Sequence, residues 1–381
     1  MKKALLLMII VFFISSTTLI GVGCKEEAAP AEEAVEEAVE EEAAPAEEAV
    51  EEEEVAEKVL KFGVVMRDAS ASFARVLIAG TQEKADELGI ELIINDSHND
   101  SLLQLDQMDT LLSTNVDAFV FGGAVDQAAV IPGVIEFNKA GIPVGAIDSA
   151  PTGGDLVAYV GSDHSIVAKR AAEALIKLLE EKYGEVPEGK VMKILGNLSD
   201  DVCTQCNRGF HSIVDEYPQL TFVEGEGNWN PTDAGSVAAD LLTAYGDEII
   251  AVYIMYDLMA PGVIPAIEAA GYDSKDLVIV SQDASAEGLF LMREGKIDAE
   301  AIQRHFESAK LNVKLLYDYI NGEELPQPGD EFEAEGVTWY VYENPYGKGI
   351  HINPDSLIVP WDVGIDDPIV MGNITERLGE Q

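Results

Sequence analysis

Three carboxylates follow three apolar stretches of the chain, at the point where each stretch gives way to a turn. Asp148 ends the run 141–147, Asp257 follows the run 251–255, and Asp283 follows the run 277–280. Such runs are typical of strands that are buried in a parallel sheet. Each carboxylate could cap the helix after it. Three acids at equivalent strand ends together favour a site that accepts hydrogen bonds from a polar ligand.

A regular alternation of strand and helix patterns must position these acids. The first set has strands at 60–66, 90–94, 118–121 and 143–147, with helices at 72–88, 101–113 and 127–140. The second has strands at 190–196, 221–225, 251–255 and 278–281, with helices at 166–183, 207–216, 231–245, 261–270 and 286–294. This alternation predicts an α/β fold of two open parallel-sheet lobes with right-handed crossovers. Ligands of such sheets bind beyond the carboxyl ends of the strands, so the acids should line one cleft.

The chain begins with a pattern that is typical of export. Lys2 and Lys3 precede the apolar run 4–14, and residues 15–20 follow it, which indicates a signal peptide over residues 1–23. The small residues before Cys24 resemble a bacterial lipobox, with Gly21 where that pattern prefers Leu. We therefore expect Cys24 to be lipidated and to anchor the protein to the cell membrane, with an ordinary signal peptide as the alternative. No later run is long and apolar enough to span a bilayer.

Residues 24–58 form a low-complexity segment dominated by Glu and Ala. A block of like charge without aromatic residues cannot bury a core, so we expect a disordered acidic tether. The whole chain of 381 residues has a net charge of −46, which makes nucleic acid an implausible partner because both surfaces would be negative. We expect a monomer.

Few motifs of catalysis or metal binding occur. The chain has no Gly-x-Ser-x-Gly, no His-Glu-x-x-His and no phosphate loop, so we expect neither an enzyme nor a cofactor. Cys203 and Cys206 stand three residues apart, and a metal site there would need two further ligands, of which only His211 is near in sequence. A local disulfide and two unreactive thiols remain open for this pair.

Several stretches carry a family resemblance through their order and spacing. They are GIPVGAIDSAP at 141–151, YVGSDH at 159–164, YIMYDLMAPG at 253–262, IVSQDASAEG at 279–288 and AEAIQRHF at 299–306. From about residue 59 to 322 the chain resembles the type I periplasmic binding proteins, in particular the ribose- and galactose-type substrate-binding lipoproteins of sugar ABC transporters. The resemblance implies two Rossmann-like lobes joined by a three-strand hinge. It places residues 59–162 and 304–335 in the first lobe, and residues 163–303 and 336–381 in the second.

The resemblance also implies a set of ligand-binding residues. It places Asp148, Asp257, Asp283 and Gln303 at polar ligand positions, and Phe73 and Trp229 at aromatic ones, although Trp229 could instead make a lobe-surface contact. Tyr256 and Thr204 stand where the family has an Asn and an Arg, and Ser149 stands where sugar binders often carry Arg. A guanidinium could come from Arg67, Arg75, Arg208 or Arg304. Without one, the acid-rich pocket suits a polyol, an amino sugar or a cationic solute.

The resemblance implies a function in transport. We expect an exported, lipid-anchored protein that captures a small solute, a sugar or sugar derivative, by hinge closure and delivers it to an ABC permease. The alternatives are a ligand sensor that docks on a membrane receptor and a binder of a non-sugar solute. The sequence identifies neither the solute nor the role of residues 323–381.

Overall fold

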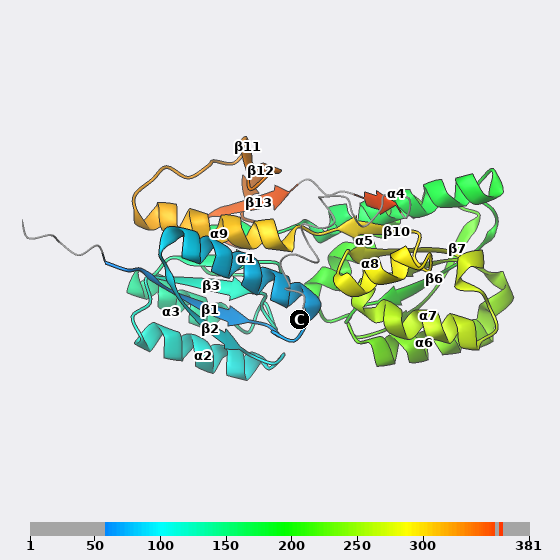
Figure 1. Cartoon of the computed structure of the whole chain (residues 1–381), viewed down its shortest axis with the longest axis horizontal. Helices are drawn as coiled ribbons and strands as arrows, with labels where there is room; N and C mark the ends of the chain where they lie inside the picture. The colour runs from blue at the N-terminus through cyan, green and yellow to red at the C-terminus, as the bar shows by residue number, and fades with distance from the viewer. Residues whose placement is uncertain (1–57, 355–357, 361–381) are drawn as a thin grey trace, which may run out of the picture. The chain divides into compact units, whose positions relative to one another are not determined.

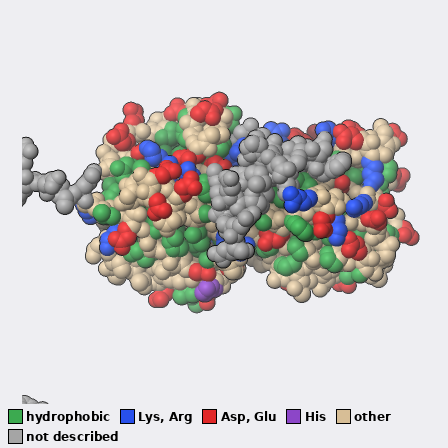
Figure 2. Space-filling model, in the orientation of Figure 1, with side chains coloured by type: hydrophobic (Ala, Val, Ile, Leu, Met, Phe, Trp, Pro, Cys, Tyr) green, Lys and Arg blue, Asp and Glu red, His purple; other side chains and the backbone are tan. Residues whose placement is uncertain are grey.

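The computed structural model describes residues 58–354 and 358–360. The expected signal peptide, the lipidation site Cys24 and the acidic tether up to residue 57 lie outside the described residues, as do residues 361–381. Within the described part, no helix combines the length and the apolar character needed to cross a membrane. On the face shown in Figure 2, Asp and Glu side chains are spread over the surface rather than gathered in one patch.

The first lobe is built on an eight-stranded sheet with the order β11-β12-β13-β5-β4-β3-β1-β2. Its parallel part comprises β1 (Lys61–Met66), β2 (Glu91–Asp96), β3 (Ala118–Gly122), β4 (Val144–Ile147) and β5 (Ala158–Val160), and β13 (Ile350–Pro354) continues it beside β5. Antiparallel strands β12 (Val337–Glu343) and β11 (Glu331–Ala334) complete the edge. Helices α1 (Ser72–Leu88) and α9 (His305–Ile320) cover one face, while α2 (Ser101–Ser113) and α3 (Ile131–Ala140) cover the other (Figure 1).

The second lobe is built on a six-stranded sheet with the order β14-β10-β9-β8-β6-β7. The parallel strands are β6 (Gly189–Leu195), β7 (Leu220–Glu226), β8 (Ile249–Ile254), β9 (Val278–Asp283) and β10 (Ala299–Ile302), and β14 (Ile358–Pro360) is antiparallel to β10. The helices of this lobe are α4 (His164–Tyr183), α5 (Asp201–Val214), α6 (Pro231–Tyr245), α7 (Ala260–Ala269) and α8 (Ala286–Arg293). The predicted α/β fold of two parallel-sheet lobes is confirmed.

The described chain passes from one sheet to the other after β5, after β10 and between β13 and β14. The expected boundary at residue 336 is wrong, because β12 and β13 belong to the first sheet rather than to the second lobe. Their apolar side chains, such as Trp339 and Ile352, pack with Leu311 and Leu315 of α9 in one buried cluster. Burial of this face explains why the two strands extend the first sheet.

Polar caps set where several helices begin. The Asp200 side chain accepts a hydrogen bond from the Val202 amide, so α5 begins at Asp201 rather than at the expected residue 207. Asp126 accepts hydrogen bonds from the amides of Ala128 and Ala129, and this turn delays the start of α3 to Ile131. These two shifts matter because Asp126 and Asp200 both lie at the carboxyl ends of the sheets, where the acids were expected to gather.

Candidate functional site

A cavity of about 850 Å³ lies between the two lobes, at the carboxyl ends of the strands of both sheets. Its volume falls within the range of small-molecule sites. The first lobe contributes loops after β1, β2, β3 and β4, and the second lobe contributes loops after β6, β7, β8 and β9. His164 and Gln303 add side chains from the segments that join the lobes. The cavity therefore lies at the carboxyl ends of the strands, where the sequence predicted a cleft.

Six of the eight predicted ligand-binding residues line this cavity, namely Phe73, Asp148, Trp229, Tyr256, Asp283 and Gln303. They come from both lobes and from the segment between β10 and α9. Trp229 faces the cavity, so the alternative of a lobe-surface contact does not describe it.

The other two predicted residues, Asp257 and Thr204, lie outside the cavity lining. Asp257 is fully buried, and its Oδ2 accepts a hydrogen bond from the Ser285 amide at 2.5 Å. Burial first, and then the nearby Asp283 carboxylate, raise the pKa of Asp257 well above its usual range. Thr204 is exposed on α5, because the early start of that helix turns Asp201 and Val202 to the cavity instead.

Asp148 and Asp283 occupy backbone conformations that L-residues rarely adopt. Their φ angles are 64° and 96°. Such conformations persist only where the surrounding structure fixes them, and they cluster at binding sites. Asp148 accepts a hydrogen bond from the Ser149 hydroxyl at 2.9 Å, and Asp283 accepts one from the Gln303 side-chain amide. The strained turn holds each carboxylate at the cavity wall, one in each lobe.

Each of these aspartates also faces a buried histidine from a segment that joins the lobes. His164 Nε2 lies 3.9 Å from the Asp148 carboxylate, and His305 Nε2 lies 3.8 Å from the Asp283 carboxylate. Burial lowers the pKa of His305, but the nearby Asp283 carboxylate outweighs it, so the net shift is upward. The two lobes thus present similar Asp–His arrangements at the two ends of the hinge.

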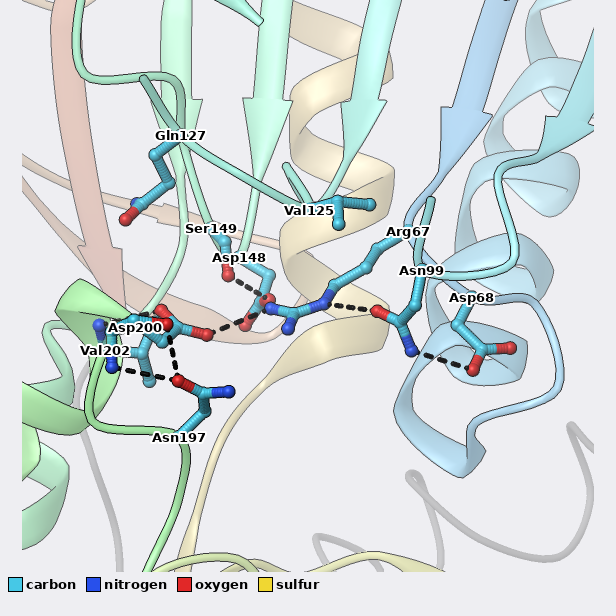
Figure 3. Close-up of polar contacts among 12 residues, drawn as sticks. Arg67, Asp68, Asn99, Val125, Gln127, Asp148, Ser149, Asn197, Asp200 and Val202 are labelled. Carbon is cyan, nitrogen blue, oxygen red and sulfur yellow. Dashed lines mark hydrogen bonds and ion pairs between the residues drawn. The ribbon is translucent and has the colours of Figure 1, made fainter. Parts of the chain in front are cut away.

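Arg67 supplies the guanidinium that the sequence left unassigned. Among the four candidate arginines it alone lines the cavity. Its Nη1 donates to Asp200 Oδ2 at 3.1 Å and its Nε donates to Asn99 Oδ1 at 2.9 Å, while the Asn99 amide donates to Asp68 (Figure 3). The guanidinium therefore links the first lobe to the second.

Three aromatic side chains form an apolar part of the wall. The rings of Phe73 and Tyr256 meet edge to face at 6.3 Å, and Trp229 meets Tyr256 at the same centroid distance. The Trp229 Nε1 and the Tyr256 hydroxyl are buried and have no hydrogen-bond partner within residues 58–354 and 358–360. Burial and the Asp283 charge raise the pKa of Tyr256, so its hydroxyl keeps its proton. Unpaired groups beside a cavity are available to a ligand.

The sequence did not single out several polar residues of the wall, including Asn99, Gln127, Asn197, Asp200 and Glu287. Asn99 follows β2 and Asn197 follows β6. The rule that located the acids, a polar residue just beyond an apolar strand, also applies to these two.

Cys203 and Cys206 are both free and buried on α5, so the structure supports the alternative of two thiols. Burial raises the pKa of the Cys203 thiol to about 11 and also raises that of Cys206. Cys206 Sγ accepts a hydrogen bond from Gln282 at 3.2 Å. Thiols in this state are poor nucleophiles.

Two parallel-sheet lobes, joined through repeated chain crossings and closed around one polar and aromatic cavity, define a two-lobed solute-binding protein. The chain belongs to the periplasmic binding protein family, because residues 62–324 match the family model described as "Periplasmic binding protein domain".

Known proteins agree with this assignment. The ribose import binding protein of Bacillus subtilis is 26% identical over 269 residues, which cover 71% of this chain and 84% of that protein. The D-apiose import binding protein of Actinobacillus succinogenes is 31% identical over 246 residues, which cover 63% of this chain and 76% of that protein. The crystal structure of an ABC transporter solute binding protein from Bacillus halodurans with bound myo-inositol matches with a TM-score of 0.65 and 26% identity, over 80% of this chain and 95% of that chain.

Proposed function

We propose that this protein captures a small polyhydroxylated solute, a sugar or a sugar derivative, between its lobes and delivers it to an ABC-type permease. The observation that carries the proposal is the placement of Asp148 and Asp283, from different lobes, on the wall of one cavity. Relatives that are named for ribose, D-apiose or a bound myo-inositol support the same class of solute. The proposal includes no catalysed step.

The cavity wall has the kinds of side chain that bind sugars. Carboxylates and side-chain amides form strong hydrogen bonds with sugar hydroxyls, and an aromatic face packs against the C–H side of a sugar ring. Asp148, Asp283 and Gln303 supply the polar groups, and Trp229 supplies the aromatic surface. A solute that contacts both lobes stabilises the closed form, because its affinity for the closed form exceeds its affinity for the open one.

The N-terminal pattern extends the proposal to the place of action. The signal sequence would export the chain, a lipid on Cys24 would anchor it to the membrane, and the acidic tether would hold a monomeric binding unit away from the negatively charged surface. Labelling with a radioactive fatty acid tests the anchor. Incorporation should be lost in Cys24→Ala, and incorporation that persists in this variant would contradict the anchor at this residue.

A thermal-shift screen of the purified full chain against sugars, polyols, amino sugars, nucleosides and amino acids tests the capture of a solute. A ligand at a hundred times its dissociation constant adds about 2.7 kcal/mol to the free energy of unfolding, which gives a clear rise in Tm. Asp148→Asn and Asp283→Asn should each reduce the shift. Glu136→Gln, which removes an exposed carboxylate on α3, should leave it unchanged. No shift with any sugar or polyol would contradict the proposal.

A further inference from the structure

The cavity wall carries far more acid than base. The first lobe contributes Asp68, Asp126 and Asp148, and the second contributes Asp200, Asp201, Asp283 and Glu287. Among the described residues that line the cavity, Arg67 is the sole Lys or Arg. Carboxylates that face one another across a closing cleft repel, and this repulsion raises the free energy of the closed form. A positive charge between the lobes would remove part of this cost.

Most of these carboxylates already have partners within the protein. Asp126 accepts amides of its own turn, Asp200 holds Arg67, and Asp68, Asp201 and Glu287 accept hydrogen bonds from neighbouring side chains. These five acids are therefore tied to the protein itself. Asp148 and Asp283 also accept one hydrogen bond each, from Ser149 and Gln303. What distinguishes these two is the positive-φ backbone that fixes each carboxylate at the cavity wall, one in each lobe.

Neither Asp148 nor Asp283 forms an ion pair with Lys or Arg in the part of the chain that the structure describes. Their side chains are only 11% and 12% exposed, and the histidines that face them lie beyond hydrogen-bonding distance. A buried carboxylate without a cationic partner is costly unless a ligand satisfies it. Each lobe thus holds one carboxylate that faces a histidine but has no Lys or Arg partner among the described residues.

A second, independent observation shows that this part of the wall lacks a donor. Gln303 is 4% exposed, its Nε2 donates to Asp283, and its buried Oε1 has no hydrogen-bond partner among the described residues. An amide oxygen can only accept a hydrogen bond. Asp148, Asp283 and Gln303 therefore offer three acceptors to the cavity, and an ammonium group offers three donors and no acceptor.

The aromatic wall also suits a cation. Phe73, Trp229 and Tyr256 line the same cavity as the two aspartates. The face of an aromatic ring attracts an ammonium group, and the described Lys side chains that lie over rings contact other aromatic residues. None of these described Lys side chains lies over Phe73, Trp229 or Tyr256, although the Phe73 ring also packs 5.7 Å from the His305 ring.

From this acceptor-rich, acid-rich and aromatic wall we infer that the solute carries a protonated amine, so that the preferred ligand is an amino sugar or an amino polyol. The inference rests on the function proposed above and names the class of solute. Asp148 and Asp283 belong to opposite lobes. An ammonium group bound between them therefore links the binding of the solute to closure of the lobes. The ammonium group is attracted to both carboxylates at short range only when the lobes are close together.

Isothermal titration of the full chain with matched ligand pairs tests this inference. The pairs are D-glucosamine with D-glucose, D-galactosamine with D-galactose, and scyllo-inosamine with scyllo-inositol. We expect the amine to bind at least about tenfold more tightly than its hydroxyl partner in the pair whose scaffold fits, a difference of about 1.4 kcal/mol. N-Acetyl-D-glucosamine keeps the nitrogen but not the charge, and it should lose the gain.

Two outcomes separate the inference from the function on which it rests. Equal or tighter binding of the plain sugar or polyol in every pair would overturn the amine and leave sugar capture intact. Failure of all members to bind would overturn the amine inference, and failure of every sugar and polyol in the thermal-shift screen as well would overturn the proposed function itself.

Isosteric variants locate the charge. Asp148→Asn and Asp283→Asn keep the shape of each side chain and should reduce the preference for the amine at least threefold. Glu136→Gln changes the net charge equally but lies on the exposed side of α3, and it should keep the preference. Circular dichroism confirms that each variant is folded. Retention of the full preference in both Asp variants would overturn the inference.

Discussion

Arg67 and Asp200 form an ion pair that joins the two lobes, with Arg67 Nη1 3.1 Å from Asp200 Oδ2 (Figure 3). Arg67 directly follows β1 of the first lobe, and Asp200 caps α5 of the second. Both side chains are largely buried, at 19% and 11% exposure. Asn99 holds the guanidinium from the other side. This pair exists only while the lobes are close, so it favours the closed form.

Replacement of Arg67 should weaken solute binding. Arg67→Met removes the hydrogen bond to Asp200 and leaves that carboxylate without its cation. A hydrogen bond to a charged group contributes about 1.5–3 kcal/mol, so we expect a loss of affinity of at least tenfold. Isothermal titration measures the affinity, and small-angle scattering of the solute-free protein measures the shift toward open forms.

Arg208→Met is the matched control, because Arg208 is exposed on α5 and does not line the cavity. It removes the same charge from the exposed side of α5, the helix that Asp200 caps, and should leave both measurements unchanged. The role assigned to the Arg67–Asp200 pair is wrong if both variants bind the solute alike.

Gly196 should control the position of the Trp229 ring. A Cβ atom at residue 196 would lie 2.0 Å from Trp229 Cζ2, which is far inside van der Waals contact. Gly196→Ala therefore displaces the indole from its place in the wall, and we expect a roughly tenfold loss of affinity. Quenching of tryptophan fluorescence by the solute should decrease in the same variant.

A double-mutant cycle isolates this contact. In a Trp229→Leu background the clash is absent, so the further change Gly196→Ala should have little additional effect on affinity. Strictly additive losses would show that Gly196 acts on the site by another route than the indole.

The strand-end rule predicted where the cavity lies but not which acids face it. Asp257 and Asp283 both follow apolar strands, and the sequence treats them alike. Asp283 has a φ of 96° and lines the cavity. Asp257 begins a 3-10 turn, and its carboxylate accepts a hydrogen bond from the Ser285 amide, just before α8. Contacts between residues 28 positions apart decide this difference. A local pattern contains no information about them.

The fold shows the same division between local and distant information. In β12 the buried residues Val337, Trp339 and Val341 alternate with more exposed ones, which is a local strand pattern. The choice of sheet depends on burial against α9, which is a contact between distant segments. Local periodicity therefore predicted the two lobes and most of their elements, whereas the family resemblance assigned β12 and β13 to the wrong lobe.

Cys203 and Cys206 should be protected as long as the protein is folded. Both thiols are buried, and burial raises both pKa values. In the Cys24→Ala variant we expect almost no reaction with Ellman's reagent at pH 8 under native conditions, and two thiols per chain after denaturation. No thiol after denaturation without reductant would mean that the pair is oxidised in the isolated protein.

Glu300 should make the protein less stable as the pH rises. Its side chain on β10 is fully buried. Burial first, and then the charges of Asp257 and Asp283, raise the pKa of Glu300 well above its usual range. In the unfolded chain Glu titrates near pH 4.3, at about its normal pKa. Between that value and the raised pKa the folded protein holds a proton that the unfolded chain has released, so stability falls as pH rises through this window.

Glu300→Gln replaces the carboxyl with a neutral isostere and should remove this part of the pH dependence. The Tm of the variant minus that of the original protein should increase from pH 4 to pH 8, measured by calorimetry. Asp257, whose pKa is raised for the same reasons, leaves some decline in the variant. Glu136→Gln on the exposed face of α3 should show no such trend. A constant difference in Tm across the range would mean that folding does not raise the pKa of Glu300.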